Sequence, residues 1–292
     1  MDRTQLQAFV SIVEQGSISA AAGHLHLTQS AVSKRLQTLE SQLGDGLLDR
    51  IGRGVQLTDA GQRLLPIARR ILADMELARQ AVQHSPGQVR GALNLATSHH
   101  LGLYRLPDVL SRFSRQYPAV DLNLEFMDSE EGCAAVESGR LELAVVTLPR
   151  TPSSRLITHR IWDDPLALCA APDHPLQQQP AIDVEQLARH PAILPDRRTF
   201  THRLIAEALA AVGAEPEVRM STNYLETIKM LVSIGLGWSS LPRTMLDERV
   251  VALPLDLGIH RQLGSVVHRG RTLSAPARAF LALLTQGGSQ ER

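Results

Sequence analysis

The sequence predicts an α/β protein in three parts: a helical N-terminal segment closed by a β-hairpin, a long connecting helix, and a larger region of two α/β lobes. Three observations predict this class. Apolar residues recur at helical spacing from Leu6 to about residue 43. One amphipathic stripe then runs from residue 59 to about residue 84, and from residue 91 short aliphatic runs alternate with helical segments. We therefore expect domains at 1–58, 59–90 and 91–292.

The composition is that of an ordinary globular protein. Of 292 residues, 43% are hydrophobic and 21% are charged, and the formal net charge is zero, so a nucleic-acid partner would need a local basic patch. Cys133 and Cys169 lie far apart in apolar surroundings, which argues against a disulfide framework or a zinc cluster and fits a reducing cytosol. Neither a signal-peptide pattern nor an apolar run of about 18 residues is found, so we expect a cytoplasmic protein without membrane contact.

The N-terminal segment is expected to hold three helices and a hairpin. The first helix should begin before Leu6 and end near Gly16, where its apolar pattern stops. Residues 19–43 read as two further helices, with Ser19 and Thr28 as their N-caps. The stretch "LLDRIGRGVQLT" then has two short apolar runs around Gly-Arg-Gly, which predicts a β-hairpin.

The last of these helices has one apolar and one polar face. Val32, Leu36, Leu39 and Leu43 are spaced to form one buried stripe. The opposite face carries amide, hydroxyl and cationic groups, which suit base edges and phosphates in a major groove, and the hairpin would act as a wing. A three-helix bundle with a solvated polar face is the alternative, and periodicity alone does not decide between them. The candidate DNA-binding residues are Ser19, Thr28, Gln29, Ser30, Ser33, Lys34, Gln37, Arg50 and Arg53.

The connecting helix, expected within 59–90, has an apolar stripe that must be shielded from water. The same helix of a second subunit would cover it most economically, and packing on its own chain is the alternative. Pro66 lies inside the pattern, so we expect a kink or a late helix start there, and residues 84–91 read as a hinge. The candidate dimerisation residues are Leu64, Ile67, Ile71, Met75, Ala78 and Val82.

The third region alternates strands and helices in two sets. The order β-α-β-α-β after residue 91 predicts a parallel sheet with helices on both faces. Two strands, "LITHRIW" and "LALCAAP", then lead to a second alternating set, and a final helix, "APARAFLALL", could return to the first. We expect lobe I at 91–162 and 269–292, lobe II at 163–268, and a cleft between them.

The ordered motifs resemble a known family. The stretch from "LQAFVSIVEQGS" through "AAGHLHLTQSAVS" and "LESQLG" to "VQLTDAGQRLL" looks like the winged helix-turn-helix of LysR-type transcriptional regulators, and the layout of nearly the whole chain is similar. Two departures stand out. Leu48 replaces the usual Phe, a packing change that should be tolerated, and Ser30 replaces a frequent Pro, which leaves its base contact open.

The resemblance implies a periplasmic-binding-protein-like domain with a small-molecule effector between its lobes. Ligands of open α/β sheets bind at the carboxyl ends of strands, where helix N-termini offer free N–H groups, and hydroxyls there suit a carboxylate or another small anion. Taken singly, each such residue could equally be a cap or a turn residue. The effector-binding candidates are Thr97, Ser98, His99, His100, Ser129, Thr147, Thr199, Phe200, Thr201, His202, Thr222 and Asn223.

The function predicted is that of a bacterial, ligand-responsive transcription factor. As a homodimer or homotetramer it would bind an interrupted inverted repeat in promoter DNA and could contact RNA polymerase. A solute-binding module for a transporter is a weaker hypothesis, because the N-terminal segment is then unexplained. An enzyme is not expected, because the chain has no P-loop or nucleophile elbow. We read Asp163–Asp164 and Glu130–Glu131 as solvated acids, and we expect neither a metal, since His99–His100 lacks a third ligand, nor a cofactor.

Overall fold

The computed structural model describes residues 1–51, 54–83, 89–179 and 181–288. The chain divides into two compact units, one formed mainly by the residues before Val89 and one formed mainly by those from Val89 onwards. Among the described helices, none is both long enough and apolar enough to span a membrane. Each unit is considered separately below.

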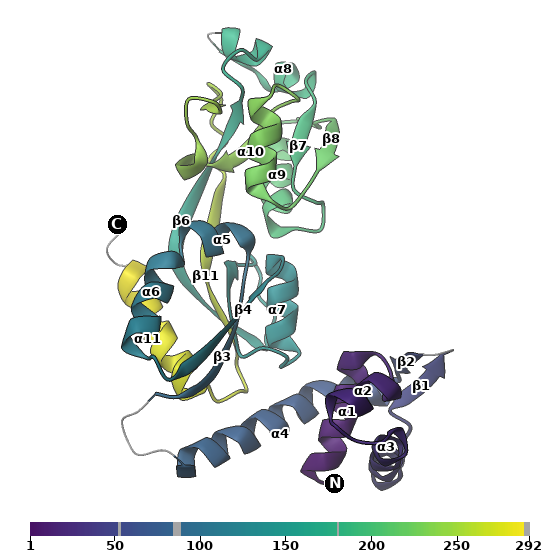
Figure 1. Cartoon of the computed structure of the whole chain (residues 1–292). Helices are drawn as coiled ribbons and strands as arrows, with labels where there is room; N and C mark the ends of the chain where they lie inside the picture. The colour runs from purple at the N-terminus through teal and green to yellow at the C-terminus, as the bar shows by residue number, and fades with distance from the viewer. Residues whose placement is uncertain (52–53, 84–88, 180, 289–292) are drawn as a thin grey trace. The chain divides into compact units, whose positions relative to one another are not determined.

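The first unit is a helical domain with a two-stranded hairpin (Figure 1). Its helices begin at polar caps: Asp2 and Gln5 form a capping box, and the Ser17 and Thr28 hydroxyls accept backbone N–H groups of α2 and α3. Gly16, with φ of 71°, ends the first helix as expected. The elements are α1 (Arg3–Gln15), α2 (Ile18–His24), α3 (Gln29–Leu43), β1 (Leu48–Ile51), β2 (Gly54–Leu57) and α4 (Asp59–Gln83).

Two details of the predicted helices were wrong. Ser19 is not a cap, because α2 begins one residue earlier and Ser17 accepts the N–H of Ala20 at 3.1 Å. Leu43 does not continue the buried stripe of α3; it is 43% exposed, and it is the last residue of the helix. Val32, Leu36 and Leu39 are buried, and Phe9 of α1 lies in the same core.

The wing is attached to the core by backbone-directed contacts. Glu40 of α3 accepts the N–H of Leu47 at 2.8 Å, just before β1. Thr58 follows β2, and its hydroxyl caps α4 by accepting the N–H of Gly61. The same hydroxyl donates to the Gly46 carbonyl at 2.7 Å. A Cβ at Gly61 would lie 2.1 Å from the Leu47 carbonyl oxygen, so only glycine allows this approach.

The long helix α4 starts at Asp59, before Pro66, so the expected late start was wrong and the proline lies inside the helix. Part of the expected stripe is covered by its own chain: Leu64 and Ile71 pack against the helix-turn-helix core beside the buried Ala68. Ile67 and Met75 are 45% and 44% exposed, and Ala78 is exposed. The side chain of Val82 lies outside the described residues, as does most of the expected hinge.

The second unit contains a seven-stranded sheet in the order β10-β6-β11-β5-β3-β4, with β9 also paired to β6. In the first lobe β3 pairs in parallel with both β4 and β5, so the carboxyl ends of all three strands meet at one edge. Helices α6 and α11 lie on one side of these strands and α7 on the other (Figure 1). The elements are β3 (Gly91–Thr97), α5 (His99–Tyr104), α6 (Pro107–Gln116), β4 (Val120–Phe126), α7 (Ser129–Glu137), β5 (Leu143–Thr147) and α11 (Ala275–Gly288).

Two long antiparallel strands, β6 (Leu156–Ala170) and β11 (His260–His268), run from the first lobe into the second (Figure 1). We expected two short strands where β6 is continuous through Asp163, Asp164 and Pro165. Leu263–Val267 of β11 pair with β5 of the first lobe. The expected boundary, which gave all of 163–268 to lobe II, would therefore place these two paired strands in different lobes.

The second lobe surrounds the buried Trp238, whose indole N–H donates to the carbonyls of Leu187 and His190. Its strands and helices match the expected second alternating set, with short additions at α8 and β10. The elements are α8 (Val184–Ala188), β7 (Ala192–Leu194), α9 (Phe200–Ala211), β8 (Val218–Ser221), α10 (Leu225–Ser233), β9 (Ser239–Pro242) and β10 (Val251–Ala252).

Candidate functional sites

The polar face of α3 is available to a partner. Its candidate side chains follow the Thr28 cap, and the buried stripe fixes them on the outer side of the helix. Gln29, Ser30, Lys34 and Gln37 are exposed and Ser33 is half-buried. The arrangement leaves amide, hydroxyl and ammonium groups free to meet base edges or phosphates.

Ser19 has a different role from the expected cap. Its hydroxyl accepts a hydrogen bond from the Gln29 amide nitrogen at 2.9 Å, which joins α2 to the start of α3. This contact holds the Gln29 amide, the group that we expect to meet DNA. On the wing, Arg53 and the side chain of Arg50 lie outside the described residues.

A cavity of about 390 Å³ lies at the carboxyl ends of β3, β4 and β5 and is closed on its other side by the second lobe. Most of the effector-binding candidates line it, and they come from both lobes. The lining residues among them are Ser98, His99, His100, Ser129, Thr147, Thr199, Phe200, Thr201 and Asn223. Their contact with an effector stays a prediction.

Thr97, His202 and Thr222 do not line this cavity. Thr97 is fully buried and donates its hydroxyl to the Val145 carbonyl at 2.8 Å, which ties β3 to β5. The Nδ1 of His202 lies 2.8 Å from the Pro195 carbonyl oxygen. Thr222 stands at a turn, with its hydroxyl 3.5 Å from the backbone nitrogen of Tyr224. These residues fit the cap-and-turn alternative.

The cavity floor holds a buried cation that sequence reasoning missed. Arg261 of β11 is 3% exposed, and its Nε donates to Asp164 at 2.9 Å. Asp164 is fully buried, and Arg105 lies 3.7 Å from its other oxygen. Asp164 is therefore not the solvated acid that we expected. Two guanidinium groups, those of Arg261 and Arg105, therefore approach this one buried carboxylate.

Arg261 also contacts the second lobe, because its Nη1 lies 3.3 Å from the Thr201 hydroxyl near the start of α9. No signal in the sequence marks Arg261, since it is one charged residue inside an otherwise ordinary strand pattern. The guanidinium and the hydroxyl border the cavity side by side.

His100 adds an unpartnered donor or acceptor to the same wall. It is 5% exposed, and neither ring nitrogen has a hydrogen-bond partner among the described residues. Glu226 is the nearest acid, at 3.9 Å from Nδ1. Burial, and secondly the positive charge of Arg261, lowers the pKa of His100 from 6.5 to about 4, so the ring is neutral at pH 7.

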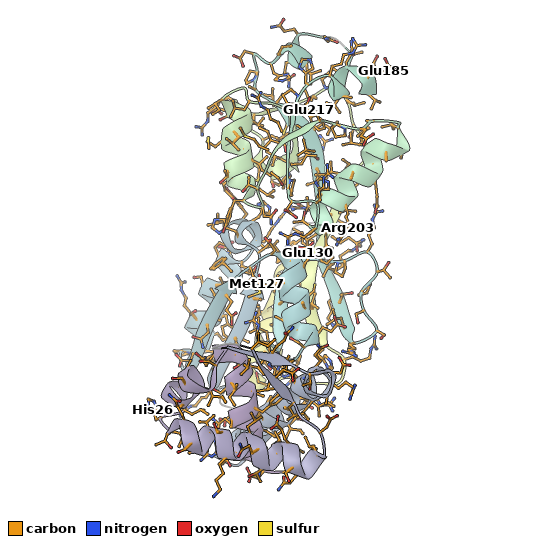
Figure 2. The ribbon with its side chains drawn as sticks, turned by 90° about the vertical axis from the view of Figure 1, so that its right-hand side faces the viewer. His26, Met127, Glu130, Glu185, Arg203 and Glu217 are labelled. Carbon is orange, nitrogen blue, oxygen red and sulfur yellow. The ribbon has the colours of Figure 1, made fainter. Side chains whose placement is uncertain are left out.

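Direct contacts between the lobes border the cavity. The Glu130 carboxylate of α7 accepts the N–H of Phe200, the first residue of α9, and lies 3.9 Å from Arg203 (Figure 2). Asn223 donates its amide to Asp128 at 2.6 Å. Glu130 is therefore not a simple solvated acid; burial raises its pKa, opposed by the Phe200 N–H and by Arg203.

An aromatic rim surrounds the same opening. The His99 ring lies 6.0 Å from that of Phe126 in the first lobe and 5.3 Å from that of Tyr224 in the second. In the part of the chain that the structure describes, no group of three or more histidine, cysteine, aspartate or glutamate side chains is placed to hold a metal ion. The cavity therefore offers charge, hydroxyls and aromatic surface.

Family comparisons agree with this architecture. Residues 4–62 match the family model described as "Bacterial regulatory helix-turn-helix protein, lysR family", and residues 86–289 match "LysR substrate binding domain". The chain belongs to the LysR family. It is a LysR-type transcriptional regulator with a helix-turn-helix DNA-binding domain and a substrate-binding domain, not an enzyme.

Relatives extend over almost the whole LysR-type chain. It is 33% identical over 284 residues to the "Uncharacterized HTH-type transcriptional regulator YeiE" of Escherichia coli K12, covering 95% of this chain and 94% of that one. It is 28% identical over 282 residues to the "RuBisCO operon transcriptional regulator" of Allochromatium vinosum, covering 94% and 93%.

Solved structures share the fold. A full-length OxyR variant from Pseudomonas aeruginosa is similar with a TM-score of 0.75 at 22% identity, over 99% of this chain and 94% of that one. Full-length CbnR in complex with its target DNA is similar with a TM-score of 0.62 at 23% identity, over 98% and 100%. LysR-type regulators with this domain organisation bind DNA and a small effector, and they oligomerise.

Proposed function

We propose that this regulator binds promoter DNA through α3 and changes its DNA contacts when a small carboxylate or similar anion occupies the interlobe cavity. The observation that carries the proposal is Arg261, a guanidinium that is 3% exposed yet borders a cavity and contacts Thr201. A charge in such a place needs partners, and an anion beside it would be held away from bulk water.

The acids around the cavity do not contradict an anionic effector. Asp128 is bonded to Asn223, and Glu130 is bonded to the N–H of Phe200, so both carboxylates point at lobe II groups. Glu131, the third acid of the lining, is exposed to solvent, and Arg261 is the buried cation of the same lining. We therefore expect the acid group of a ligand to be directed towards Arg261 and the adjoining start of α9, which Thr201 connects.

For DNA binding, we propose that two copies of α3 in a dimer read successive major grooves of an interrupted inverted repeat. The exposed Ile67 and Met75 of α4 would contribute to the dimer. Pairing of dimers into a tetramer, contact with RNA polymerase and action in the cytoplasm belong to the same proposal. An effector that changes how far the two lobes close, relative to the effector-free protein, would shift the population of DNA-bound conformations.

A thermal-shift screen tests the effector class. Small carboxylic acids are compared with their uncharged amides on the wild type and on Thr201→Val, which removes one hydroxyl and keeps the Arg261–Asp164 pair. We expect some acids to raise the Tm of the wild type, their amides not to, and the shift to shrink in Thr201→Val. Equal shifts from acids and amides would contradict the proposal.

A further inference from the structure

Glu130 occupies a position in the cavity that a ligand's acid group would favour. It is the second residue of α7 in the first lobe, and its side chain is 26% exposed. Its carboxylate crosses to the second lobe, accepts the N–H of Phe200 and lies 3.9 Å from Arg203. These two lobe II partners suit any carboxylate, not only one that belongs to the chain.

The start of α9 is built to receive an anion. The helix has 12 residues, and its Thr199 cap accepts the N–H of His202, which leaves the N–H of Phe200 for an outside acceptor. Unpaired N–H groups and the positive end of the helix dipole both favour negative charge there. In this structure Glu130 supplies that charge.

A second observation points to a ligand beside this helix start. Thr201, the next residue of α9, contacts the buried Arg261, and the unpartnered, 95% buried His100 lines the same cavity. Glu130 itself contacts neither group in the described contacts. Polar atoms with no partner in a buried wall call for one.

Building on the proposed function, we propose that Glu130 is an internal occupant of an anion subsite at the start of α9, and that the acid group of a bound effector replaces it. The exchange keeps one negative charge on the Phe200 N–H and Arg203. It also breaks a contact between the lobes, so occupancy of the subsite and the position of the lobes are coupled. Glu130 thus sets how strongly an external anion must bind in order to displace it.

Propionate, the free analogue of the glutamate side chain, tests this assignment on the full-length protein. In Glu130→Ala the subsite is empty, so propionate should raise the Tm of this variant and bind it about tenfold more tightly than it binds the wild type. Propionamide should do neither. Glu131→Ala is the matched control, because Glu131 is the adjacent, exposed acid of α7 and lines the same cavity. Its removal changes the charge of the cavity by the same amount and leaves Glu130 on the Phe200 N–H.

A second variant covers the case in which Glu130→Ala does not fold. Glu130→Gln keeps the shape of the side chain and removes its charge, so it should also bind propionate more tightly than Glu131→Gln does. Equal propionate affinity in the Glu130 and Glu131 variants would overturn the proposal.

The test separates this proposal from the proposed function. In one outcome, propionate binds selectively to the Glu130 variants while no acid changes the DNA footprint of the wild type. The anion subsite is then supported, and the proposal that an acid controls DNA binding is refuted. In the other outcome, acids change that footprint but the Glu130 and Glu131 variants bind propionate equally. Control of DNA binding by an acid is then supported, and the proposal that Glu130 occupies an anion subsite is refuted.

Discussion

His26 lies in the turn between α2 and α3 with φ of 53°, a backbone region that side chains other than glycine rarely adopt (Figure 2). The strain is local, because only the four residues from Leu25 to Thr28 join α2 to α3. The sequence predicts two helices here but not this conformation, because positive φ is uncommon at every residue other than glycine, histidine included.

His26→Gly should therefore stabilise the first unit by up to about 1 kcal/mol, because relief of strain exceeds the added entropy of the unfolded chain. Chemical denaturation of the full-length protein measures the change. His24→Gly, at the last residue of α2, is the control and should be neutral or destabilising. A loss of stability in His26→Gly would contradict this account of the turn.

His100 makes stability depend on pH. Its pKa in the folded protein, about 4, lies below the ordinary 6.5, so between these values the unfolded chain binds a proton that the folded chain does not. The free energy of unfolding should therefore fall as the pH drops from 6.5 towards 4. His100→Gln should flatten this fall, whereas His99→Gln, at the exposed neighbour, should not. Parallel curves of unfolding free energy against pH for the wild type and both variants would rule out His100 as the source of this pH dependence.

At the scale of elements, α3 presents two kinds of DNA contact. Lys34→Ala should weaken binding to all sequences and reduce the slope of log K against log salt by about 1, because an ammonium that meets phosphate releases counterions. Gln29→Ala should instead lower the preference for the operator by about 1–3 kcal/mol. Fluorescence anisotropy on operator and random DNA at several salt concentrations separates the two effects. Equal losses on both DNAs for Gln29→Ala would argue against base reading.

Ser19→Ala extends this comparison, because the Ser19 hydroxyl holds the Gln29 amide at 2.9 Å. Its loss should affect operator preference in the same direction as Gln29→Ala but less strongly.

The outer part of α4 should hold two subunits together. Ile67→Glu places a charge on an exposed apolar position and should shift the dimer towards monomer in sedimentation velocity. Gln62→Glu is the control, since position 62 is exposed and about 140° around the helix from position 67. Leu64 is a poor probe, because it packs on its own chain. A stable dimer in Ile67→Glu would exclude this face from the interface.

Elements with a clear period were predictable, and those fixed by tertiary contacts were not. The Thr28 cap, the α3 stripe up to Leu39 and strands β3, β4 and β5 follow from local pattern, whereas the Ser19 cap did not. The strand β6 was predicted in two pieces because Asp163 and Asp164 interrupt its apolar run, although Arg261 neutralises Asp164 from the neighbouring strand. The six-residue helix α5 is too short to show a period.

The candidate cavity was predictable in outline for a similar reason. Parallel strands bring their carboxyl ends together, so Ser98, Ser129 and Thr147 could be expected near one another. Arg261 and Glu130 depend on contacts between segments about 60 to 100 residues apart, which no local pattern encodes.

For the whole molecule, we propose that an anion bound in the substrate-binding domain changes how the helix-turn-helix domain of this LysR-type regulator contacts DNA. DNase I footprinting of the full-length protein on the DNA upstream of its own gene, with and without an acid that raises its Tm, tests this claim most directly. We predict protection of an interrupted inverted repeat whose pattern changes with the acid in the wild type but not in Thr201→Val. Protection no stronger than on random DNA, or a pattern that the acid leaves unchanged, would contradict the account.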